Sequence, residues 1–360
     1  MTAAEARAQF PVLERFAYLN AGTMGPLARG TAEAMTERAQ LDLAQGRGGK
    51  PYFEAMFALR EGVRERLAVL LGVPTDRIAL TSSTSEGCNI VLAGLDLRPD
   101  DEVVTTDAEH PGLLGPLHAS GARVRVVEVG ARPAAEALDR LAGAVSPRTK
   151  LLALSHVLWT TGQAMPVHEL RKQTGLPVLV DGAQSVGAIP VEAGNADFYT
   201  VSCQKWLCGP DPLGGLYVAD PERLRVALPT YFSVQSIEPD GSFVPKKDSN
   251  RFDSGWLGVP SLAGLVAALD AAPDWRFERA REAAERCREL LAARYEVVTE
   301  PNQSTLVSFR PDGDAAELAA RAYERGVVIR DLPGTGLLRA SCGYWTSDAD
   351  LERLLEALST

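Results

Sequence analysis

The sequence predicts an α/β protein with a large lobe built on a mostly parallel seven-stranded sheet and a smaller α/β lobe near the C-terminal end. Short apolar segments recur between residues 77 and 219, separated by helical stretches and turn-forming residues. Strands that are apolar throughout are typical of a parallel sheet covered by helices on both faces. The segments are 77–81, 102–106, 123–129, 150–156, 178–180, 198–201 and 215–218.

The pattern changes after the glycine- and proline-containing segment 255–260. We expect residues 16–260 to form the large domain, and residues 1–15 and 261–360 to form the small one. Ligands of such α/β sheets bind beyond the carboxyl ends of the strands. In the small domain we expect helices at 262–271, 275–295, 314–325 and 347–358, and strands at 296–299, 305–309, 327–330 and 337–341.

Composition and charge argue against several functional classes. The chain is 46% apolar and 23% charged, which is typical of a globular protein. A net charge of -10 with a pI near 5.1 argues against nucleic acid as the partner. No apolar window approaches a membrane span, and the N-terminus lacks the basic start and apolar run of a signal peptide. We therefore expect a cytoplasmic protein without a membrane partner.

Cysteine and histidine spacing indicates neither disulfides nor a metal. The five cysteines are scattered and include no CxxC pair, which indicates reduced thiols. Cys287 lies on the apolar face of a helical pattern, so we expect it in the core. The four histidines include no ligand spacing such as HExxH, so we expect no metal site.

The segment 177–217 carries the strongest functional signal. Six lysines occur among 37 basic residues, and one of them, Lys205, lies within apolar sequence. A buried amine loses its proton readily and can attack a carbonyl, which arginine cannot do. Asp181 ends the apolar run 178–180, where a carboxylate must be paired or solvated. Pyridoxal phosphate (PLP) chemistry requires such a lysine, together with a carboxylate that faces the pyridine nitrogen.

Two other predicted strands are followed by groups that suit the same cofactor. Residues 80–95 run from a strand through a hydroxyl-rich turn into a helix, where Thr84, Ser85 and backbone N–H groups could hold a phosphate. Ordinary helix capping by Ser83 or Ser85 is the alternative. His110 follows a strand and could stack on a flat cofactor, although a lone histidine is more often structural.

With Asp181, Gln184 and Lys205 in place, the chain resembles the class V aminotransferase family of fold-type I PLP enzymes. That family includes cysteine desulfurases, cystine and cysteine C–S lyases, isopenicillin N epimerase-like proteins and kynureninase. The likeness extends from YLNAGTMGPL (18–27) to LLRASCGYWTSDADLERLLEAL (337–358), and DGAQSVGAIPV followed by the lysine is its most specific motif. The resemblance implies a small amino-acid substrate and a homodimer with cofactor sites near the interface.

The resemblance also implies a role for each matching residue. Lys205 would bind PLP covalently and act as the base at the substrate Cα. Asp181 would pair with the pyridine nitrogen, Gln184 would contact the ring hydroxyl, and His110 would stack on the ring. The phosphate would be held by Thr84, Ser85 and Ser202, and the substrate by Arg339 at its α-carboxylate and by the turn that contains Asn20 and Thr23.

Three positions depart from the family pattern. Gln204 stands where many relatives have a phosphate-binding histidine. Trp256 stands where many have a threonine that reaches the phosphate of the neighbouring subunit. Trp159 or Thr160 replaces an asparagine common in desulfurases. We still expect Gln204 and Trp256 among the cofactor contacts, because hydroxyl and backbone donors remain and the indole of Trp256 carries an N–H.

The positions of the cysteines limit which reaction of the family we expect. Desulfurases carry a mobile cysteine shortly before the substrate-binding arginine, whereas residues 288–338 contain none, and Cys342 follows Arg339 in a strand-like run. We therefore expect C–S bond cleavage by β-elimination from a cysteine- or cystine-like substrate. Transamination and epimerisation remain alternatives because they begin with the same deprotonation. A non-catalytic scaffold and a nucleotide-binding enzyme are further alternatives, and the latter is disfavoured because no GxGxxG fingerprint occurs.

Overall fold

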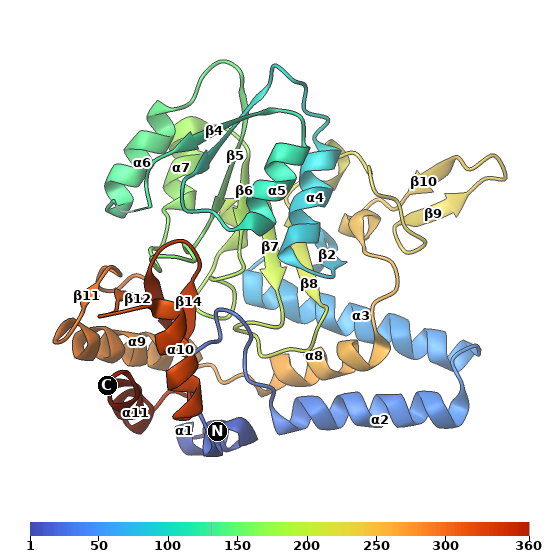
Figure 1. The fold of residues 1–360 in the computed structure, drawn as a ribbon. Coiled ribbons are helices and arrows are strands. Elements are labelled where there is room, and N and C mark those ends of the chain that lie inside the picture. The colour runs from blue at the N-terminus through green and yellow to red at the C-terminus, as the bar shows by residue number, and fades with distance from the viewer. Residues whose placement is uncertain (131, 360) are drawn as a thin grey trace.

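The computed structural model describes residues 1–130 and 132–359, and they form two lobes (Figure 1). The large lobe contains a seven-stranded sheet in the order β2-β8-β7-β6-β5-β3-β4. Five neighbouring strands pair in parallel, and β8 runs antiparallel between β7 and β2. The strands are β2 (Ile78–Thr81), β3 (Glu102–Thr106), β4 (Arg123–Val127), β5 (Thr149–Ser155), β6 (Val178–Asp181), β7 (Phe198–Ser202) and β8 (Gly214–Val218). The predicted fold class is confirmed.

Helices cover both faces of this sheet, which explains why its central strands β6, β7 and β8 are buried along their whole length, whereas the edge strand β4 is partly exposed and carries Arg123 and Arg125. Val178 and Val180 of β6 belong to one core, and Leu179 between them belongs to another, because successive strand residues point to opposite faces. The first face packs against α3 (Lys50–Leu71), α6 (Ala134–Gly143), α7 (Val167–Thr174) and α8 (Val259–Ala271). The second face packs against α4 (Thr84–Gly94) and α5 (Pro111–Ala119).

The small lobe is built from roughly the C-terminal quarter of the chain, from Arg276 onward, and from the N-terminus. Its sheet has the order β11-β12-β15-β14, and the N-terminal helix joins it where Arg7 pairs with Asp350 at 2.6 Å. Cys287 is buried in this lobe, as expected. The elements are α1 (Ala3–Ala8), α9 (Arg276–Ala292), β11 (Glu296–Val297), β12 (Leu306–Arg310), α10 (Ala315–Glu324), β13 (Val327–Val328), β14 (Arg330–Leu332), β15 (Leu337–Ser341) and α11 (Asp348–Leu358).

A short strand also joins the N-terminal segment to this lobe. β1 (Ala17–Tyr18) pairs in parallel with β13, and Asn20 forms an isolated bridge with Ser341. Pairing with the small lobe therefore continues past residue 16, where we placed the start of the large domain. A two-residue strand is too short to show a hydrophobic period, so the sequence carried no signal for it.

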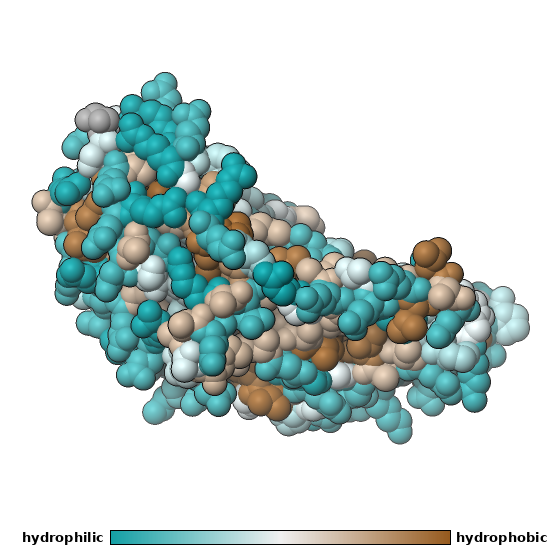
Figure 2. Space-filling view, turned by 90° about the horizontal axis from the view of Figure 1, so that it is seen from below, coloured by the Kyte–Doolittle hydropathy of each residue, from teal (hydrophilic) through white to brown (hydrophobic). Residues whose placement is uncertain are grey.

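Helix α2 (Arg29–Gln45), the end of α3 that follows it and the hairpin of β9 (Val234–Ile237) and β10 (Phe243–Pro245) extend away from the two lobes on one side of the molecule, and we call them the projecting part (Figure 1). Helix α2 packs along α8, and the hairpin projects on the same side as the ends of α2 and α3 (Figure 1). Viewed from below, apolar side chains are visible on this projecting part (Figure 2).

Two absences hold for the residues that the structure describes. None of their helices combines the length and apolar character needed to cross a bilayer. No group of three or more histidine, cysteine, aspartate or glutamate side chains is placed to hold a metal ion. All five cysteines are buried and free.

Candidate active site

The main expected site residues lie at one edge of the large sheet. Asp181 is the last residue of β6, Lys205 lies in the turn after β7, and His110 directly follows the β3 region. Because β3, β6 and β7 run parallel, their carboxyl ends meet at the same edge. Partial burial of the ring lowers the pKa of His110, the charge of Lys205 lowers this pKa further, and the charge of Asp181 opposes both effects. The structure therefore brings the three residues together.

The Lys205 amine is enclosed and makes no hydrogen bond within the described structure. Burial lowers its pKa from 10.5 to about 8, with Asp181 opposing the shift and Arg339 and Arg330 adding to it. Its turn packs against the segment around Gly25, whose N–H donates to the carbonyl of Gln204 at 2.8 Å. A Cβ atom on Gly25 would collide with the carbonyl oxygen of Lys205.

Asp181 is buried and only partly hydrogen-bonded. Its Oδ1 accepts from the N–H of Ala183 at 2.9 Å, and its Oδ2 has no hydrogen-bond partner among the described residues. Gln184 lies close by and links two neighbouring segments. It donates to the carbonyl of Gly22 at 2.8 Å and accepts from the indole N–H of Trp206 at 3.0 Å. One amide hydrogen of Gln184 remains for the predicted contact with a ring hydroxyl.

Arg339 is a buried cation without a counter-ion among the described residues. Its side chain belongs to β15 and the residue is 1% exposed. The guanidinium donates to the carbonyl of Trp159 at 2.8 Å and to Thr23 Oγ1 at 3.4 Å, and its Nε has no acceptor. Burial and the neighbouring charge of Arg330 together lower the pKa of Arg339 to about 9. An unpaired buried charge is costly, so this group suits an anionic ligand.

Arg330 is a second cation at this position, and sequence reasoning missed it. It lies opposite Arg339 in the neighbouring strand β14 and donates to Thr23 Oγ1 at 3.1 Å. The same Thr23 hydroxyl donates to Asn20 Oδ1 at 2.8 Å. Asn20 and Thr23 therefore lie beside the expected substrate arginine. The signal for Arg330 was a single arginine that ends the apolar run VVI in VVIRDL.

His110 and Trp159 form an aromatic corner next to these charges. His110 caps α5, with its Nδ1 accepting from the N–H of Gly112 at 3.0 Å. Its ring meets the Trp159 ring edge to face, with 5.3 Å between centroids. His110 is exposed on the surface of the chain, so its ring is accessible to a ligand. The indole N–H of Trp159 is buried without an acceptor.

The N-terminus of α4 offers free donors for a phosphate. Ser83 is the N-cap, because its side chain accepts from the N–H of Glu86 at 3.1 Å. Of the two capping alternatives, the structure therefore favours Ser83. The hydroxyls of Thr84 and Ser85 make no hydrogen bond within the described structure, and the first N–H groups of a helix lack intrahelical partners. Ser85 Oγ also lies beside Gly112 at the start of α5.

Three other residues expected to contact the cofactor, Ser202, Gln204 and Trp256, have other partners in the structure. Ser202 Oγ donates to Gln204 Oε1 at 2.8 Å, so these two side chains bond to each other at the end of β7. Trp256 is 63% exposed, and its ring contacts are with Phe53 and Phe232. The structure does not bring Trp256 to the Lys205 group within one chain. Its contact with a cofactor remains a prediction that requires a second copy of the chain.

The unpaired groups match the parts of PLP and of an amino acid. Lys205 offers a partner-free amine to the aldehyde, and Asp181 offers a free carboxylate oxygen to the pyridine nitrogen. The start of α4 offers hydroxyls and N–H groups to the phosphate. Arg339 offers a guanidinium to a carboxylate, and the orphaned N–H of Trp159 lies in the same region. The residues present therefore fit this cofactor.

Comparison with known sequences identifies the family. Residues 26–354 match the aminotransferase class-V family. Isopenicillin N epimerase of Streptomyces clavuligerus is 31% identical over 399 residues, covering 98% of this chain and 97% of that protein. The cysteine desulfurase CsdA of Escherichia coli (strain K12) is 28% identical over 392 residues, covering 99% of this chain and 96% of that protein.

Solved structures agree with the sequence matches. A lysine-to-alanine mutant of C-DES, with glycine covalently linked to its PLP cofactor, aligns with a TM-score of 0.90 and 28% identity over 98% of this chain and 99% of that chain. The cystine C-S lyase C-DES in complex with cysteine persulfide, its reaction product, aligns with a TM-score of 0.89, also at 28% identity and with the same coverage. The chain belongs to the class-V aminotransferase family, whose members are PLP-dependent enzymes.

Proposed function

We propose that this protein is a PLP-dependent C–S lyase that cleaves a cysteine- or cystine-like substrate by β-elimination. Arg339 carries the proposal, because its buried guanidinium lacks a counter-ion among the described residues and lies near the Lys205 amine. The α-carboxylate of an amino acid supplies the missing charge. When bound, PLP supplies an electron-withdrawing ring that stabilises negative charge at the substrate Cα.

Lys205 is prepared to act as a nucleophile and as a base. Because burial lowers its pKa to about 8, roughly a tenth of the amines are neutral at pH 7. A neutral amine would hold the cofactor through its aldehyde, and it would be able to accept the Cα proton of a bound substrate. The Asp181 carboxylate would hold a proton at the pyridine nitrogen of the cofactor, and the rings of His110 and Trp159 border the site.

The second guanidinium supports a substrate with two carboxylates. Arg330 lies beside Arg339, and Thr23 accepts from both guanidinium groups. A cysteine molecule has one carboxylate, whereas cystine has two. The pair therefore supports a cystine-like substrate, with one carboxylate on Arg339 and the other within reach of Arg330. Loss of the β-sulfur group then leaves a fragment that hydrolyses to a keto acid and ammonia.

The buried thiols support elimination rather than sulfur relay. A relay needs a mobile, accessible thiolate, and all five cysteines of the described chain are buried. Burial raises the pKa of Cys203 to about 12 and raises the pKa of Cys208 further. These thiols stay protonated near neutral pH. Sulfur would therefore leave the enzyme with the product instead of remaining on a cysteine.

Epimerisation is the second candidate, and the similarity to isopenicillin N epimerase favours it. That relative is 31% identical across 98% of this chain. Epimerisation begins with removal of the same Cα proton but returns a proton to the opposite face, and the β-substituent is retained. The two outcomes therefore differ in their products rather than in their first step.

Product analysis tests the proposal. The holoenzyme is incubated with L-cystine, L-cysteine and L-alanine, and keto acid, ammonia and persulfide sulfur are measured together with the absorbance of the cofactor. We expect keto acid and persulfide from cystine, and neither from the Lys205→Ala variant. Exchange of the Cα hydrogen with retention of sulfur would favour epimerisation. Amino transfer to an added keto acid without a sulfur product would contradict the lyase.

We also propose that the protein acts as a homodimer through the projecting part of the large lobe. Large apolar side chains are exposed there, including Leu43 at 88% and Tyr231 at 72%. Trp256 and Ile237 of the same region are also exposed. Exposed apolar area of this kind is typical of a protein–protein interface. A second copy would cover it and could bring Trp256 to the neighbouring cofactor.

A further inference from the structure

Glu86 places a carboxylate in the first turn of α4, the helix expected to hold the cofactor phosphate. One of its oxygens, Oε2, accepts three hydrogen bonds. The donors are the N–H of Ser82 at 2.6 Å, the hydroxyl of Ser82 at 2.7 Å and the hydroxyl of Ser254 at 2.6 Å. A helix N-terminus attracts any nearby anion, so an unrestrained carboxylate would compete with a phosphate for the same donors.

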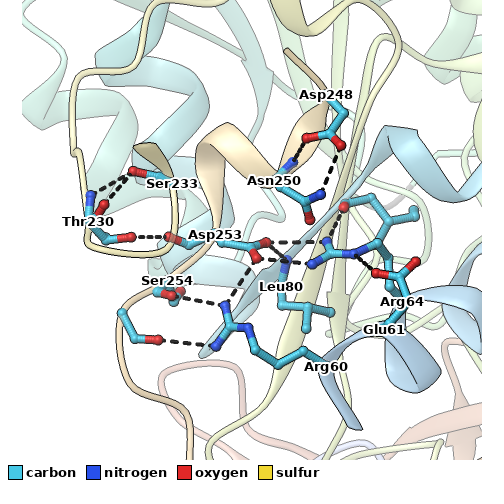
Figure 3. Close-up of polar contacts among 12 residues, drawn as sticks. Arg60, Glu61, Arg64, Leu80, Thr230, Ser233, Asp248, Asn250, Asp253 and Ser254 are labelled. Atoms are coloured by element: carbon cyan, nitrogen blue, oxygen red, sulfur yellow. Dashed lines mark hydrogen bonds and ion pairs between the residues drawn. The ribbon is translucent and has the colours of Figure 1, made fainter. Parts of the chain in front are cut away.

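The loop that supplies Ser254 is fixed by a buried ion cluster (Figure 3). Asp253 pairs with Arg60 and with Arg64, each at 3.0 Å, and all three side chains are buried. Asp253 also accepts from the N–H of Leu80 in β2 at 2.8 Å. We call Arg60, Arg64 and Asp253 the Asp253 anchor. It joins the loop to α3 and to the strand that leads into α4.

Backbone contacts extend this restraint to Ser254 itself. The N–H of Ser254 donates to the carbonyl of Leu80 at 2.8 Å, and its own carbonyl accepts from Arg60 at 3.2 Å. The carbonyl of Gly255 accepts from the same guanidinium at 3.3 Å. Both backbone polar groups of Ser254 are therefore hydrogen-bonded, and this fixes the position of its hydroxyl next to Glu86. Glu86 is held on Ser82 and Ser254, which leaves the hydroxyls of Thr84 and Ser85 without intramolecular partners.

We propose that Ser254 and Glu86 are positioning residues for the phosphate end of the cofactor. Ser254 binds the Glu86 carboxylate and so prevents it from occupying the donors at the start of α4. Glu86 in turn orders the Ser82–Ser85 turn through its bonds to Ser82. The inference rests on the proposed PLP function, and it assigns no direct contact between Ser254 or Glu86 and the cofactor.

The test compares PLP with pyridoxal, which lacks the phosphate. Full-length protein stripped of cofactor is titrated with each compound, and binding is followed by absorbance. We expect Ser254→Ala to weaken PLP binding by roughly 5- to 30-fold and to leave pyridoxal binding unchanged; the loss is smaller than the full effect of one hydrogen bond to a charged group because the two bonds from Ser82 to Glu86 remain. Ser347→Ala is the matched control, because Ser347 also donates to an acidic residue in a helix first turn, Asp350 at 2.8 Å, but in the small lobe.

A second variant makes the outcome specific to the Glu86 charge. Glu86→Gln removes the charge and keeps an acceptor oxygen, so the double variant Glu86→Gln with Ser254→Ala should recover most of the lost PLP affinity. Equal weakening of PLP and pyridoxal, or no recovery in the double variant, would overturn the inference. Unchanged PLP binding by Ser254→Ala would also overturn it. Failure of the unmodified protein to bind PLP would instead contradict the proposed function.

Discussion

Arg330 and Arg339 lie directly opposite each other on the neighbouring strands β14 and β15, and both donate to the hydroxyl of Thr23. Like charges in opposite positions of a strand pair are destabilising. Neither arginine forms an ion pair with any carboxylate of the described residues. The free protein therefore keeps an unfavourable concentration of positive charge, which an anionic substrate would relieve.

Replacing Arg339 tests its predicted role in substrate binding. Arg339→Lys keeps the positive charge but loses the planar set of donors that matches a carboxylate. We expect kcat/KM to fall by roughly 10- to 100-fold, mainly through a higher KM. Arg310→Lys is the control, because Arg310 is exposed at the end of β12. Steady-state kinetics with cystine would show no difference between the two variants if Arg339 did not bind substrate.

Arg330 should distinguish substrates with one carboxylate from those with two. We expect Arg330→Gln to lower kcat/KM for cystine several-fold more than for cysteine, because only cystine can occupy both guanidinium groups. The measurement is the ratio of the two kcat/KM values in the variant and in the unmodified enzyme. An equal loss for both substrates would show that Arg330 acts through Arg339 alone.

The lowered pKa of Lys205 predicts how covalent binding of the cofactor depends on pH. Only the neutral amine reacts with an aldehyde, and its fraction increases as pH rises through about 8. We expect the rate of PLP attachment to cofactor-free protein to rise about tenfold per pH unit below that value and to level off above it. Stopped-flow absorbance between about pH 6 and pH 10 measures this. A rate still rising steeply near pH 10 would indicate an ordinary exposed lysine.

Gly25 tests whether the substrate turn must lie against the lysine turn. A Cβ at this position would collide with the carbonyl oxygen of Lys205, so Gly25→Ala should displace one of the two segments and lower kcat. Gly30→Ala is a matched control, because Gly30 lies in α2 with no atom within 4 Å of an added Cβ. Alanine there should raise stability by up to about 1 kcal/mol. Thermal unfolding and kcat are measured for both variants. If Gly25→Ala and Gly30→Ala had similar activities, the predicted contact would be contradicted.

Trp256 tests the proposed dimer. Its indole is exposed beside Phe232 and Phe53, so Trp256→Glu should place a charge in the interface and shift the protein toward monomer. Sedimentation velocity over a range of concentrations measures this shift. The same variant should lose PLP affinity only under conditions where the unmodified protein is dimeric. A monomeric unmodified protein with full activity would exclude the dimer as a requirement.

The large sheet and the core of the site could be predicted because both have local signals. The segments expected for β3 and β8 agree with the observed strands to within one residue, since short runs rich in apolar and β-branched residues bounded by turns mark strands. Asp181 and Lys205 could be identified from the sequence because a charged group next to a buried apolar run must be paired or solvated. Arg339 could be assigned only through the family resemblance, and the structure places it beside the other two.

Other features could not be predicted because they depend on contacts between distant segments. Arg330 gains significance only from its register with Arg339, and register cannot be read from one strand. The bond from Ser254 to Glu86 joins residues 168 positions apart. Whether Ser83 or Ser85 caps α4 depends on where the helix begins, and helix boundaries are the least certain part of a sequence reading. The outward position of Trp256 follows from the Asp253 anchor, which no local pattern shows.

The most direct measurement identifies the lysine that carries the cofactor. The PLP-loaded protein is reduced with borohydride, digested and analysed by mass spectrometry, which reports the modified site among the six lysines of the chain. We predict one pyridoxyl group on the peptide that contains Lys205, and loss of this modification in Lys205→Ala. Modification of a different lysine, or no modification of the loaded protein, would contradict the account.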